Sequence, residues 1–316
     1  MSNYIVLDLE WNQGSPSTEN PKIPFEILEI GAVKLDDKNR IVDRFDRYVR
    51  PQVYKKMHFM TQKIIHLKIK DLKDADPFVV VMKDFLDWCE DDYIFCTWGS
   101  LDLTELQYNM QFYNMNPLSE EPFTYLDVQK LFSLNYEDGK SRRSLEYAVD
   151  FLHLDKSEAF HRAENDAYYT ALILKAMFGS PVMKRYSFDV FHTPSDILHE
   201  VHVTFDTYSK YISREFKKKQ YALSDKEVSS MRCFKCGNPA KIKIHWFTLN
   251  SKHYLCLAKC KEHGFLKGKI RIKKAENGNI YVVKTIKKIK KDDAALLYDQ
   301  EKKSKTKQGK IKSSPD

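Results

Sequence analysis

The sequence predicts an α/β protein in which a mixed sheet flanked by helices is followed by a small β-rich unit. Three observations lead to this fold class. Three β-rich runs open the chain, strands and helices then alternate as far as residue 178, and a compact group of cysteines lies in a β-rich stretch after residue 231. The length of 316 residues corresponds to about two domains, and the 42% of hydrophobic residues is enough for a sizeable core.

The first part of the predicted fold begins with an antiparallel meander. Its strands are Tyr4–Glu10, Ile27–Leu35 and Ile41–Val49, with a polar turn between the last two. Over residues 77–88 the pattern changes, because apolar side chains there recur at helical spacing. Further elements follow in alternation: a strand at Tyr93–Trp98, a helix at Leu101–Phe112, a strand and a helix within Phe123–Leu134, and helices at Ser144–Leu152 and Ala163–Phe178.

Composition divides the chain into four segments. Gly179-Ser180-Pro181 ends the alternating block, so we expect the first domain to span residues 1–180. Start signals for a helix, followed by apolar residues at helical spacing, predict a helical connector over residues 181–231. The β-rich unit is expected at residues 232–289, and the lysine-rich composition of residues 290–316 predicts a disordered basic tail.

Charge is distributed unevenly along the chain. Residues 231–316 hold 23 Lys and Arg against 7 Asp and Glu, a net charge of +16. The whole chain carries +8, so residues 1–230 carry −8. Such a basic end predicts a polyanionic partner, nucleic acid first and an anionic membrane surface second. A solvated tail that only aids solubility is the other interpretation.

The N-terminus and the cysteines predict where the protein resides. The N-terminal segment carries Asp8 and Glu10 where a signal peptide needs a basic and then an apolar stretch, and no run of 18 apolar residues occurs. The 6 cysteines are divided between apolar segments and one late cluster. That arrangement is typical of a reducing compartment and of metal binding rather than of a disulfide framework. We therefore expect a cytoplasmic protein.

Two carboxylates stand at the carboxyl end of the first predicted strand. Asp8 and Glu10 are two residues apart, so strand geometry places them on one face while Leu7 and Leu9 point to the other. Clustered carboxylates repel one another and cost free energy unless a cation lies between them. The pair therefore predicts half of a metal site, although the Asp-x-Glu pattern alone also occurs on strands by chance.

The candidate partners of this pair lie at the ends of later elements. Asp102 follows the strand Tyr93–Trp98, and Asp166 lies near the start of the last predicted helix, on the side of the apolar stripe that faces the sheet. His161 precedes Asp166 by five residues, which is not a same-face helical spacing, so we expect it in the preceding loop. A histidine placed there can accept a proton near neutral pH, as a general base must.

The order of these residues resembles that of the DEDDh exonuclease family. The resemblance covers residues 4–178 and rests on motifs in chain order: Asp8-x-Glu10, Glu29-Ile30-Gly31-Ala32-Val33, Trp98-Gly99-x-x-Asp102, Ser144-Leu145, and His161-Arg162-Ala163-x-x-Asp166-Ala167. The Trp-Gly-x-x-Asp form and the start Asp-Leu-Glu-Trp-Asn are similar to the KapD-like and histone-mRNA-processing branch. The resemblance implies an RNase H-like fold, 3′→5′ hydrolysis of nucleic acid and release of nucleoside 5′-monophosphates.

The resemblance also implies a two-metal mechanism, in which two divalent ions bridge the scissile phosphate and His161 acts as the general base. Oxygen donors favour Mg²⁺ or Mn²⁺ over zinc at such a site. The ligands of the two ions would be Asp8, Glu10, Asp102 and Asp166.

A second metal site is predicted in the basic half of the chain. Cys233-Phe-Lys-Cys236-Gly and Cys260-Lys-Glu-His263-Gly are two copies of one pattern, separated by 23 residues. Each copy places two ligands at a hairpin tip with a glycine that lets the backbone curl, and two tips complete the tetrahedron of a zinc ribbon. One structural Zn²⁺ would then be needed for folding. Three other side chains could replace one of these ligands: Cys256 first, then His245 and His253.

Basic and aromatic residues are interleaved in this part of the sequence. Trp246 lies among lysines, and a basic run with Lys267, Lys269 and Arg271 follows. This mixture suits single-stranded nucleic acid, whose phosphates attract cations and whose bases stack on rings. We therefore predict that these four residues and Trp11 bind substrate. The alternatives are that Trp246 belongs to the ribbon's own hydrophobic face and that Trp11, which stands where many family members carry Thr or Ser, packs in the core.

The predicted function is a metal-dependent exonuclease that acts on 3′ ends of single-stranded RNA or DNA, RNA being favoured, with the basic ribbon as a tether. An alternative from another class is a nucleic-acid-binding or regulatory protein whose RNase H-like domain no longer cleaves. The presence of all five catalytic-type residues argues against it. A membrane-surface protein would need an amphipathic helix with large apolar residues on one face, which the sequence lacks.

Overall fold

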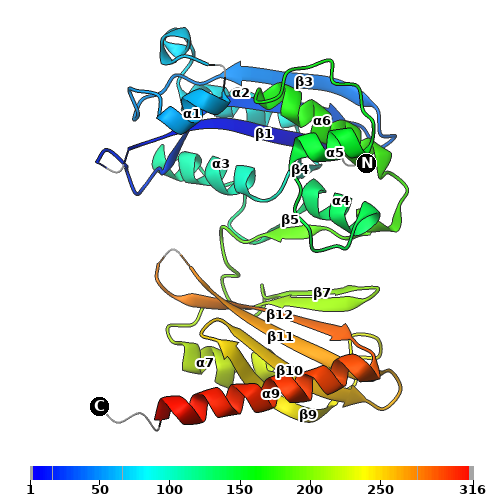
Figure 1. Cartoon of the computed structure of the whole chain (residues 1–316). Coiled ribbons are helices and arrows are strands. Elements are labelled where there is room, and N and C mark those ends of the chain that lie inside the picture. The colour runs from blue at the N-terminus through cyan, green and yellow to red at the C-terminus, as the bar shows by residue number, and fades with distance from the viewer. Residues whose placement is uncertain (1–2, 16, 66, 276, 313–316) are drawn as a thin grey trace. The chain divides into compact units, whose positions relative to one another are not determined.

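The chain folds into two compact units, residues 1–191 and residues 192–316 (Figure 1). This structure is a computed structural model. It describes the backbone but not the side chains of residues 306–312. The residues that it leaves undescribed are 1–2, 16, 66, 276 and 313–316.

The first unit is built on a mixed sheet with the strand order β3-β2-β1-β4-β5-β6. β2 is antiparallel to both β1 and β3, which confirms the predicted meander, and β1, β4 and β5 run parallel. β6 pairs antiparallel with β5, so the unit continues past the boundary predicted at residue 180. The strands are β1 (Asn3–Gln13), β2 (Phe25–Leu35), β3 (Ile41–Tyr48), β4 (Tyr93–Thr97), β5 (Phe123–Asp127) and β6 (Ser187–Asp189).

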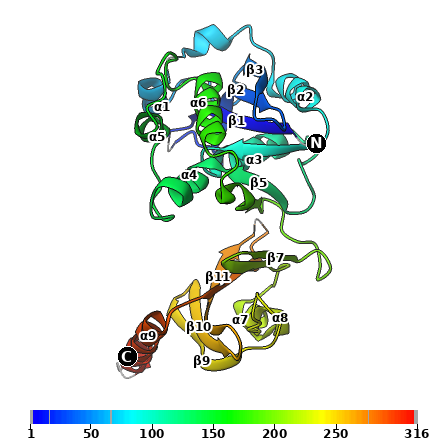
Figure 2. The ribbon, with the colours of Figure 1, turned by 90° about the vertical axis from the view of Figure 1, so that its right-hand side faces the viewer.

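Helices cover both faces of this sheet, so the predicted fold class is confirmed. One face packs against α2 (Phe78–Cys89) and α3 (Leu101–Phe112) in a core that includes Leu7 and Leu9. The other face packs against α6, which lies across β1 and β2 (Figure 2). The remaining helical segments are α1 (Phe59–Ile64), η1 (Ile69–Leu72), α4 (Val128–Tyr136), α5 (Leu145–Phe151), α6 (Ala163–Ala176) and η2 (Pro181–Lys184).

The second unit contains a separate sheet with the strand order β7-β8-β12-β11-β10-β9. All neighbouring strands in it are antiparallel. This sheet is larger than the predicted ribbon, because two strands that precede residue 232 join it. The strands are β7 (Val201–Phe205), β8 (Tyr208–Ile212), β9 (Lys241–Asn250), β10 (His253–Cys260), β11 (Gly264–Lys274) and β12 (Ile280–Lys288).

The prediction of a helical connector over residues 181–231 is wrong. The centre of this segment forms the hairpin β7–β8, and only the short helices α7 (Lys219–Ser224) and α8 (Lys226–Ser229) follow it. Val201, Val203 and Phe205 alternate with polar residues at the period of a strand. The same segment also contains apolar residues at helical spacing, but the pairing of β8 with β12 stabilises the strand conformation.

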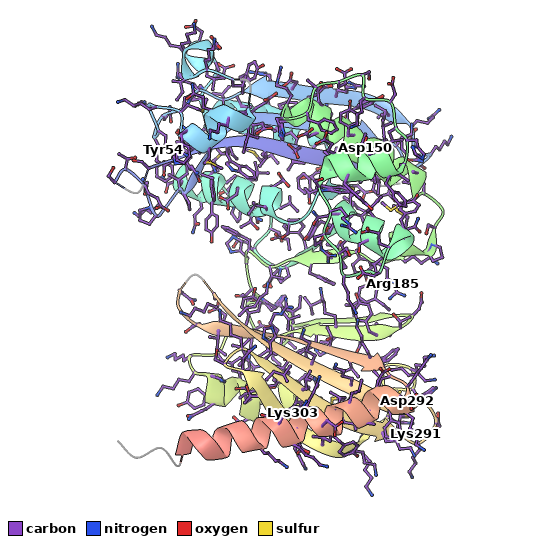
Figure 3. All side chains as sticks on the ribbon, viewed as in Figure 1. Tyr54, Asp150, Arg185, Lys291, Asp292 and Lys303 are labelled. Atoms are coloured by element: carbon purple, nitrogen blue, oxygen red, sulfur yellow. The ribbon has the colours of Figure 1, made fainter. Side chains whose placement is uncertain are left out.

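The prediction of a disordered tail is wrong for residues 291–312, which form the helix α9 (Lys291–Lys312). Ala294 and Leu297 are buried against the second sheet and anchor this helix. Its first turn contains acidic residues, among them Asp292 (Figure 3), and carboxylates there interact favourably with the helix dipole. This apolar contact could not be predicted from the lysine-rich composition of the segment. The last residues of the predicted tail, 313–316, lie outside the described residues.

Helices lie on opposite faces of the second sheet (Figure 2). One face packs against α7 and α8 in a core that includes Ile270, Ile272 and Val282. On the other face α9 covers Leu255 and Leu257 of β10. No helix in the described part of the chain has the length and apolar character needed to cross a membrane.

Candidate functional site

Asp8 and Glu10 lie towards the end of β1, on the side of the sheet that α6 covers. In the register of β1 and β2, Asp8 opposes Gly31 and Glu10 opposes Glu29. A β-bulge between Glu10 and Trp11 interrupts this register directly after the two carboxylates. Bulges redirect side chains at the ends of regular pairing and are frequent beside active sites.

Gly31 lets α6 approach the sheet closely beside these carboxylates. A Cβ atom on Gly31 would lie 2.0 Å from the backbone nitrogen of Glu164 and 2.1 Å from the carbonyl carbon of Ala163. Real Cβ atoms do not make contacts this short, so the first turn of α6 can meet β2 here only because residue 31 is glycine. That turn also carries Asp166, whose carboxylate is thereby delivered to the end of β1.

The loop before α6 brings His161 to the same place. One ligand atom each from Glu10, His161 and Asp166 lie within 4.8 Å of one another. The backbone N–H of His161 donates to Asp166 Oδ2 at 3.2 Å. His161 has a φ angle of 65°, a left-handed conformation that persists in a non-glycine residue only where its surroundings hold it. Its side chain is exposed, so it can meet a substrate.

Asp102 lies in the first turn of α3 and completes the group of carboxylates. The backbone N–H groups of Leu9 and of Asp102 itself interact with its carboxylate, and its charge acts on Asp8. Glu105, one turn later on α3, is only 4% exposed, and its Oε2 has no hydrogen-bond partner among the described residues. Glu105 was not among the predicted site residues, although its spacing of three residues from Asp102 places both on one side of the helix.

Burial raises the pKa values of all four carboxyl groups, and neighbouring carboxylates add to the shift for Asp8, Glu10 and Asp102. Burial, followed by the charge of Asp166, raises the pKa of Glu10 to about 8. Burial also raises the pKa of Asp102 to about 7 and that of Asp166 to about 6. The pKa of Asp8 stands well above its ordinary value because of burial and then the charges of Asp102 and Asp166. Groups placed in this way ionise together only when a cation compensates them.

The donor atoms of this group fit hard divalent cations. They are carboxylate oxygens, which Mg²⁺ and Mn²⁺ prefer as ligands. Asp166 Oδ1 is buried and has no hydrogen-bond partner among the described residues, so it retains a free acceptor position. A cation held between these oxygens would lower all four pKa values and remove the repulsion that burial imposes.

An ion pair between the buried carboxylate of Glu29 and the partly exposed Arg162 holds the loop that carries His161. Glu29 is fully buried, and Arg162 Nε donates to its Oε1 at 2.9 Å. The Arg162 guanidinium also lies over the Tyr48 ring, 5.1 Å from its centroid. Breaking a buried pair leaves an uncompensated charge, so Arg162 anchors the residue next to His161. Both partners stand in the motifs that carry the family resemblance, but their pairing could not be predicted, because 133 positions separate them.

Trp11 packs against neighbouring side chains. Its ring centroid lies 5.7 Å from that of Phe25, with the two planes tilted by 51°. It also contacts the core beneath α2 and α3 while keeping part of its surface exposed. Of the two alternatives for this residue, the described contacts support packing in the core.

The second unit brings Cys233, Cys236, Cys260 and His263 together, with one ligand atom of each within 4.8 Å of the others. The Sγ atoms of Cys236 and Cys260 are 3.7 Å apart. His263 Nδ1 lies 3.5 Å from Cys233 Sγ and 3.7 Å from Cys260 Sγ. A tetrahedron with Zn–S bonds of about 2.3 Å has edges of about 3.8 Å. The four atoms therefore stand at the spacing that a zinc ion requires.

The backbone around this cluster has the conformation predicted for two curled tips. Gly237 and Gly264 have φ angles of 72° and 81°, which glycine adopts without strain. The backbone N–H of His263 is the largest cause that lowers the pKa of the Cys260 thiol, to about 6, and a thiolate is the form that binds metal. Cys256 is buried elsewhere, and burial raises its pKa to about 12. His245 and His253, the other two alternative ligands, also lie outside the cluster.

The structure separates the basic and aromatic residues that were predicted to bind substrate. Lys267, Lys269 and Arg271 alternate along β11 and share the face that α9 partly covers. Trp246 packs against the opposite face, where its Nε1 donates to the Ser229 carbonyl oxygen at 2.9 Å. Trp246 therefore contributes to the hydrophobic core of this unit and is not brought together with the three cations.

Comparison with known proteins identifies relatives of the first unit. The model of the exonuclease family RNase_T matches residues 5–174. The DNA polymerase III PolC-type protein of Streptococcus pyogenes serotype M2 is 23% identical over 161 residues, which are 50% of this chain and 10% of that protein. A second such protein, from serotype M18, has the same identity and coverage. The chain thus spans about 10% of the length of the curated relatives that it matches.

Solved structures of nucleases resemble this chain at low sequence identity. Exonuclease I, whose structure is described as suggesting how processivity is achieved, is 13% identical with a TM-score of 0.50, and the match covers 82% of this chain and 55% of that one. The nuclease domain of 3′hExo, a DEDDh family member bound to rAMP, is 21% identical with a TM-score of 0.49, and the match covers 56% of this chain and 91% of that one. The likeness to exonuclease I supports the RNase H-like exonuclease fold.

Proposed function

The chain belongs to the exonuclease family, and from this premise we propose that it is a 3′→5′ exonuclease that hydrolyses single-stranded nucleic acid to nucleoside 5′-monophosphates. One observation carries the proposal. Ligand atoms of Glu10 on β1, Asp166 on α6 and the loop histidine His161 lie within 4.8 Å of one another, and the charges of Asp102 and Asp166 act on the neighbouring Asp8. The packing of the fold does not require mutually repelling acids at this point. Phosphodiester hydrolysis by bound metal ions does require acidic ligands. The residues of this group are Asp8, Glu10, Asp102, Asp166 and His161.

We assign the four carboxylates as ligands of two Mg²⁺ or Mn²⁺ ions. Ions bound there supply the charge that lowers the pKa of an attacking water and stabilises the leaving 3′ oxygen. His161, exposed and within reach of Glu10 and Asp166, accepts the proton of that water. Arg162, anchored on Glu29, keeps the loop of His161 in place during the reaction.

Single-stranded RNA is the substrate that we favour over DNA. The support for this choice is in the sequence. The Trp98-Gly99-x-x-Asp102 motif and the tryptophan after Glu10 are similar to the KapD-like and histone-mRNA-processing branch of the family.

We further propose that Cys233, Cys236, Cys260 and His263 hold one structural Zn²⁺. The tetrahedral spacing of their ligand atoms and the lowered pKa of the Cys260 thiol support this assignment. The two tips then form a zinc ribbon that is built into the larger second sheet. Such a cluster needs reduced thiols, so we place the protein in the cytoplasm.

A nucleic-acid-binding protein that no longer cleaves is the alternative from another class. It would have no use for an exposed histidine held beside two partly buried carboxylates, and that arrangement favours the enzyme. Incubation with Mg²⁺ and matched 5′-labelled RNA and DNA single strands tests the proposal. We expect a ladder that shortens from the 3′ end, faster for RNA. Products cut within the strand, or no products with either metal, would reject it.

A further inference from the structure

One face of the second sheet is covered by protein only in part. Residues that oppose one another across antiparallel strands point to the same face. Leu257 and Leu255, which pack under α9, oppose Lys267 and Lys269 of β11. In the strand order of the sheet (Figure 1), the same face therefore continues from β10 onto β11, β12 and β8.

Five cationic side chains share this continuation. Lys267, Lys269 and Arg271 alternate along β11, Lys287 of β12 opposes Lys267, and Lys210 of β8 lies one strand further in the row of Lys269. Residues two apart on a strand are roughly 6.6–6.8 Å apart, and neighbouring strands are about 4.8 Å apart. The five charges therefore form one patch, which we call the cationic face.

Four of the five cations of the cationic face have no acidic partner among the described residues. In the described part of the chain, Lys267, Lys269, Arg271 and Lys287 take part in no ion pair. They act on one another instead: burial, and then the charges of Arg271, Lys267 and Lys287, lower the pKa of Lys269. Holding these like charges together costs free energy that a bound polyanion would recover.

Lys284 shows how the same sheet accommodates a lysine with a structural role. It lies on the opposite face of β12 and is 3% exposed. Its Nζ donates to the backbone carbonyl of Glu227 and, at 3.2 Å, to that of Ser230, and lies 3.6 Å from the Glu227 carboxylate. A lysine that serves the fold is thus satisfied internally, whereas Lys267, Lys269, Arg271 and Lys287 have no ion-pair partner among the described residues.

We propose that the cationic face binds the phosphate backbone of single-stranded nucleic acid. Cations in rows at the spacing of a strand suit a linear polyanion. The ring of Tyr208 lies next to this patch, where it stacks on Phe205 at a centroid distance of 4.7 Å and lies 5.3 Å from Lys287 Nζ. The inference rests on the proposed function, because it gives the second unit a hold on the strand that the first unit shortens.

A lipid surface fits the cationic face less well. Proteins that lie on membranes insert large apolar side chains between their basic residues. Among the described residues of the second unit, the exposed large apolar side chains lie outside β8, β11 and β12: Ile197, Leu198, Tyr221, Leu249, Leu296 and Tyr298.

Salt-dependent binding tests the proposal on the full chain. An Asp8→Asn background prevents cleavage, and the Kd for a labelled 20-nucleotide single strand is measured from low to high salt. The variant Lys269→Gln, Arg271→Gln, Lys287→Gln removes three charges from the cationic face. Each phosphate contact contributes about 0.7 to the log–log salt slope of a single strand, so we expect the slope to fall by about 2 and the affinity at low salt to drop.

A control variant separates a binding surface from a general loss of charge. Lys217→Gln, Lys218→Gln, Lys226→Gln removes the same three charges from exposed positions around α7 and α8. We expect it to keep the parental slope. An unchanged slope in the cationic-face variant, or equal falls in both variants, would overturn the proposal. Binding to phosphatidylserine vesicles that only the cationic-face variant loses, with its oligonucleotide slope unchanged, would reassign the patch to membranes.

A separate activity measurement tests the exonuclease proposal independently of the cationic face. The wild-type chain is given Mg²⁺ and a trinucleotide, a substrate too short to reach across several contacts, and release of mononucleotide is measured. Absence of release would reject the proposed function, whereas the salt slope alone decides the cationic face.

Discussion

Gly31→Ala adds one methyl group at the point where β2 meets the first turn of α6. The added Cβ would lie 2.0 Å from the Glu164 backbone nitrogen, and ordinary contacts begin at 3.4 Å. Since the opposing atoms are backbone, they cannot rotate away, and the helix end must retreat by about 1.4 Å. Asp166 and the loop of His161 move with that helix end, while Asp8 and Glu10 stay on β1.

Gly31→Ala is expected to slow hydrolysis strongly while leaving the protein folded. A misplacement of about 1 Å in a catalytic group can cost roughly 10²-fold in rate, so we expect hydrolysis to slow about 10²-fold or more. Overpacking of a well-packed region costs about 1–3 kcal/mol in the free energy of unfolding. The variant should therefore remain folded at room temperature and bind metal more weakly.

The assay is the rate of mononucleotide release from a trinucleotide at saturating Mg²⁺, together with urea unfolding of the same preparation. Gly268→Ala is the matched control, because its Cβ would lie 2.6 Å from side-chain atoms of Met231 and Trp246 in the second unit. It should lower stability without slowing this reaction. Wild-type rates in Gly31→Ala, at any stability, would refute the claim that close approach of α6 places Asp166.

Other consequences can be measured directly. Without added metal, the melting temperature should fall as the pH rises from about 5 to 8. The folded-state pKa values of Glu10 and Asp102, about 8 and about 7, exceed their unfolded values, so stability that is fully present below about pH 4 is lost as the pH passes through them. Mg²⁺ should then raise the melting temperature more at pH 8 than at pH 5, and the opposite order would contradict a metal site made of these acids. His161→Ala should slow hydrolysis by roughly 10²–10⁴-fold with metal binding retained, as measured by calorimetry with Mn²⁺, and higher pH should partly restore the rate; an unchanged pH–rate profile would remove His161 from the mechanism. Purified protein should contain one zinc ion per chain by elemental analysis, and Cys260→Ser should lose it and unfold at lower temperature; full zinc content in that variant would place the ligands elsewhere.

The first unit could be predicted well from the sequence because its signals are local. The apolar spacing of the helix at Leu101–Phe112 matches α3, and strand alternation puts Leu7 and Leu9 in the core and Asp8 on the other side. Chain order alone then placed the catalytic-type residues at element ends. The contacts of these residues could not be predicted, because the pairing of Glu29 with Arg162 and the approach of α6 to Gly31 join distant segments.

The second unit was harder to predict because its elements depend on distant partners. The apolar residues of 201–212 fit both a helical and a strand period. The strand forms because Ile212 pairs with Val283, which lies far along the chain. Trp246 stands among lysines in the sequence, yet its ring packs against the core of this unit and its Nε1 donates to the Ser229 carbonyl oxygen. The helix α9 is held on the sheet by the apolar contacts of Ala294 and Leu297. These two contacts could not be predicted, because the surrounding sequence is strongly basic.

The central claim is that converging carboxylates and a loop histidine hydrolyse a strand from its 3′ end. It is tested most directly with a 3′-terminally labelled single-stranded RNA, Mg²⁺, and the wild type beside Asp8→Asn, Asp102→Asn and Asp166→Asn, each shown to be folded by circular dichroism. The account predicts that the wild type releases the label as a nucleoside 5′-monophosphate in the first turnover and that each variant releases none. Label released as a longer fragment, or released by the variants at near wild-type rates, would contradict it.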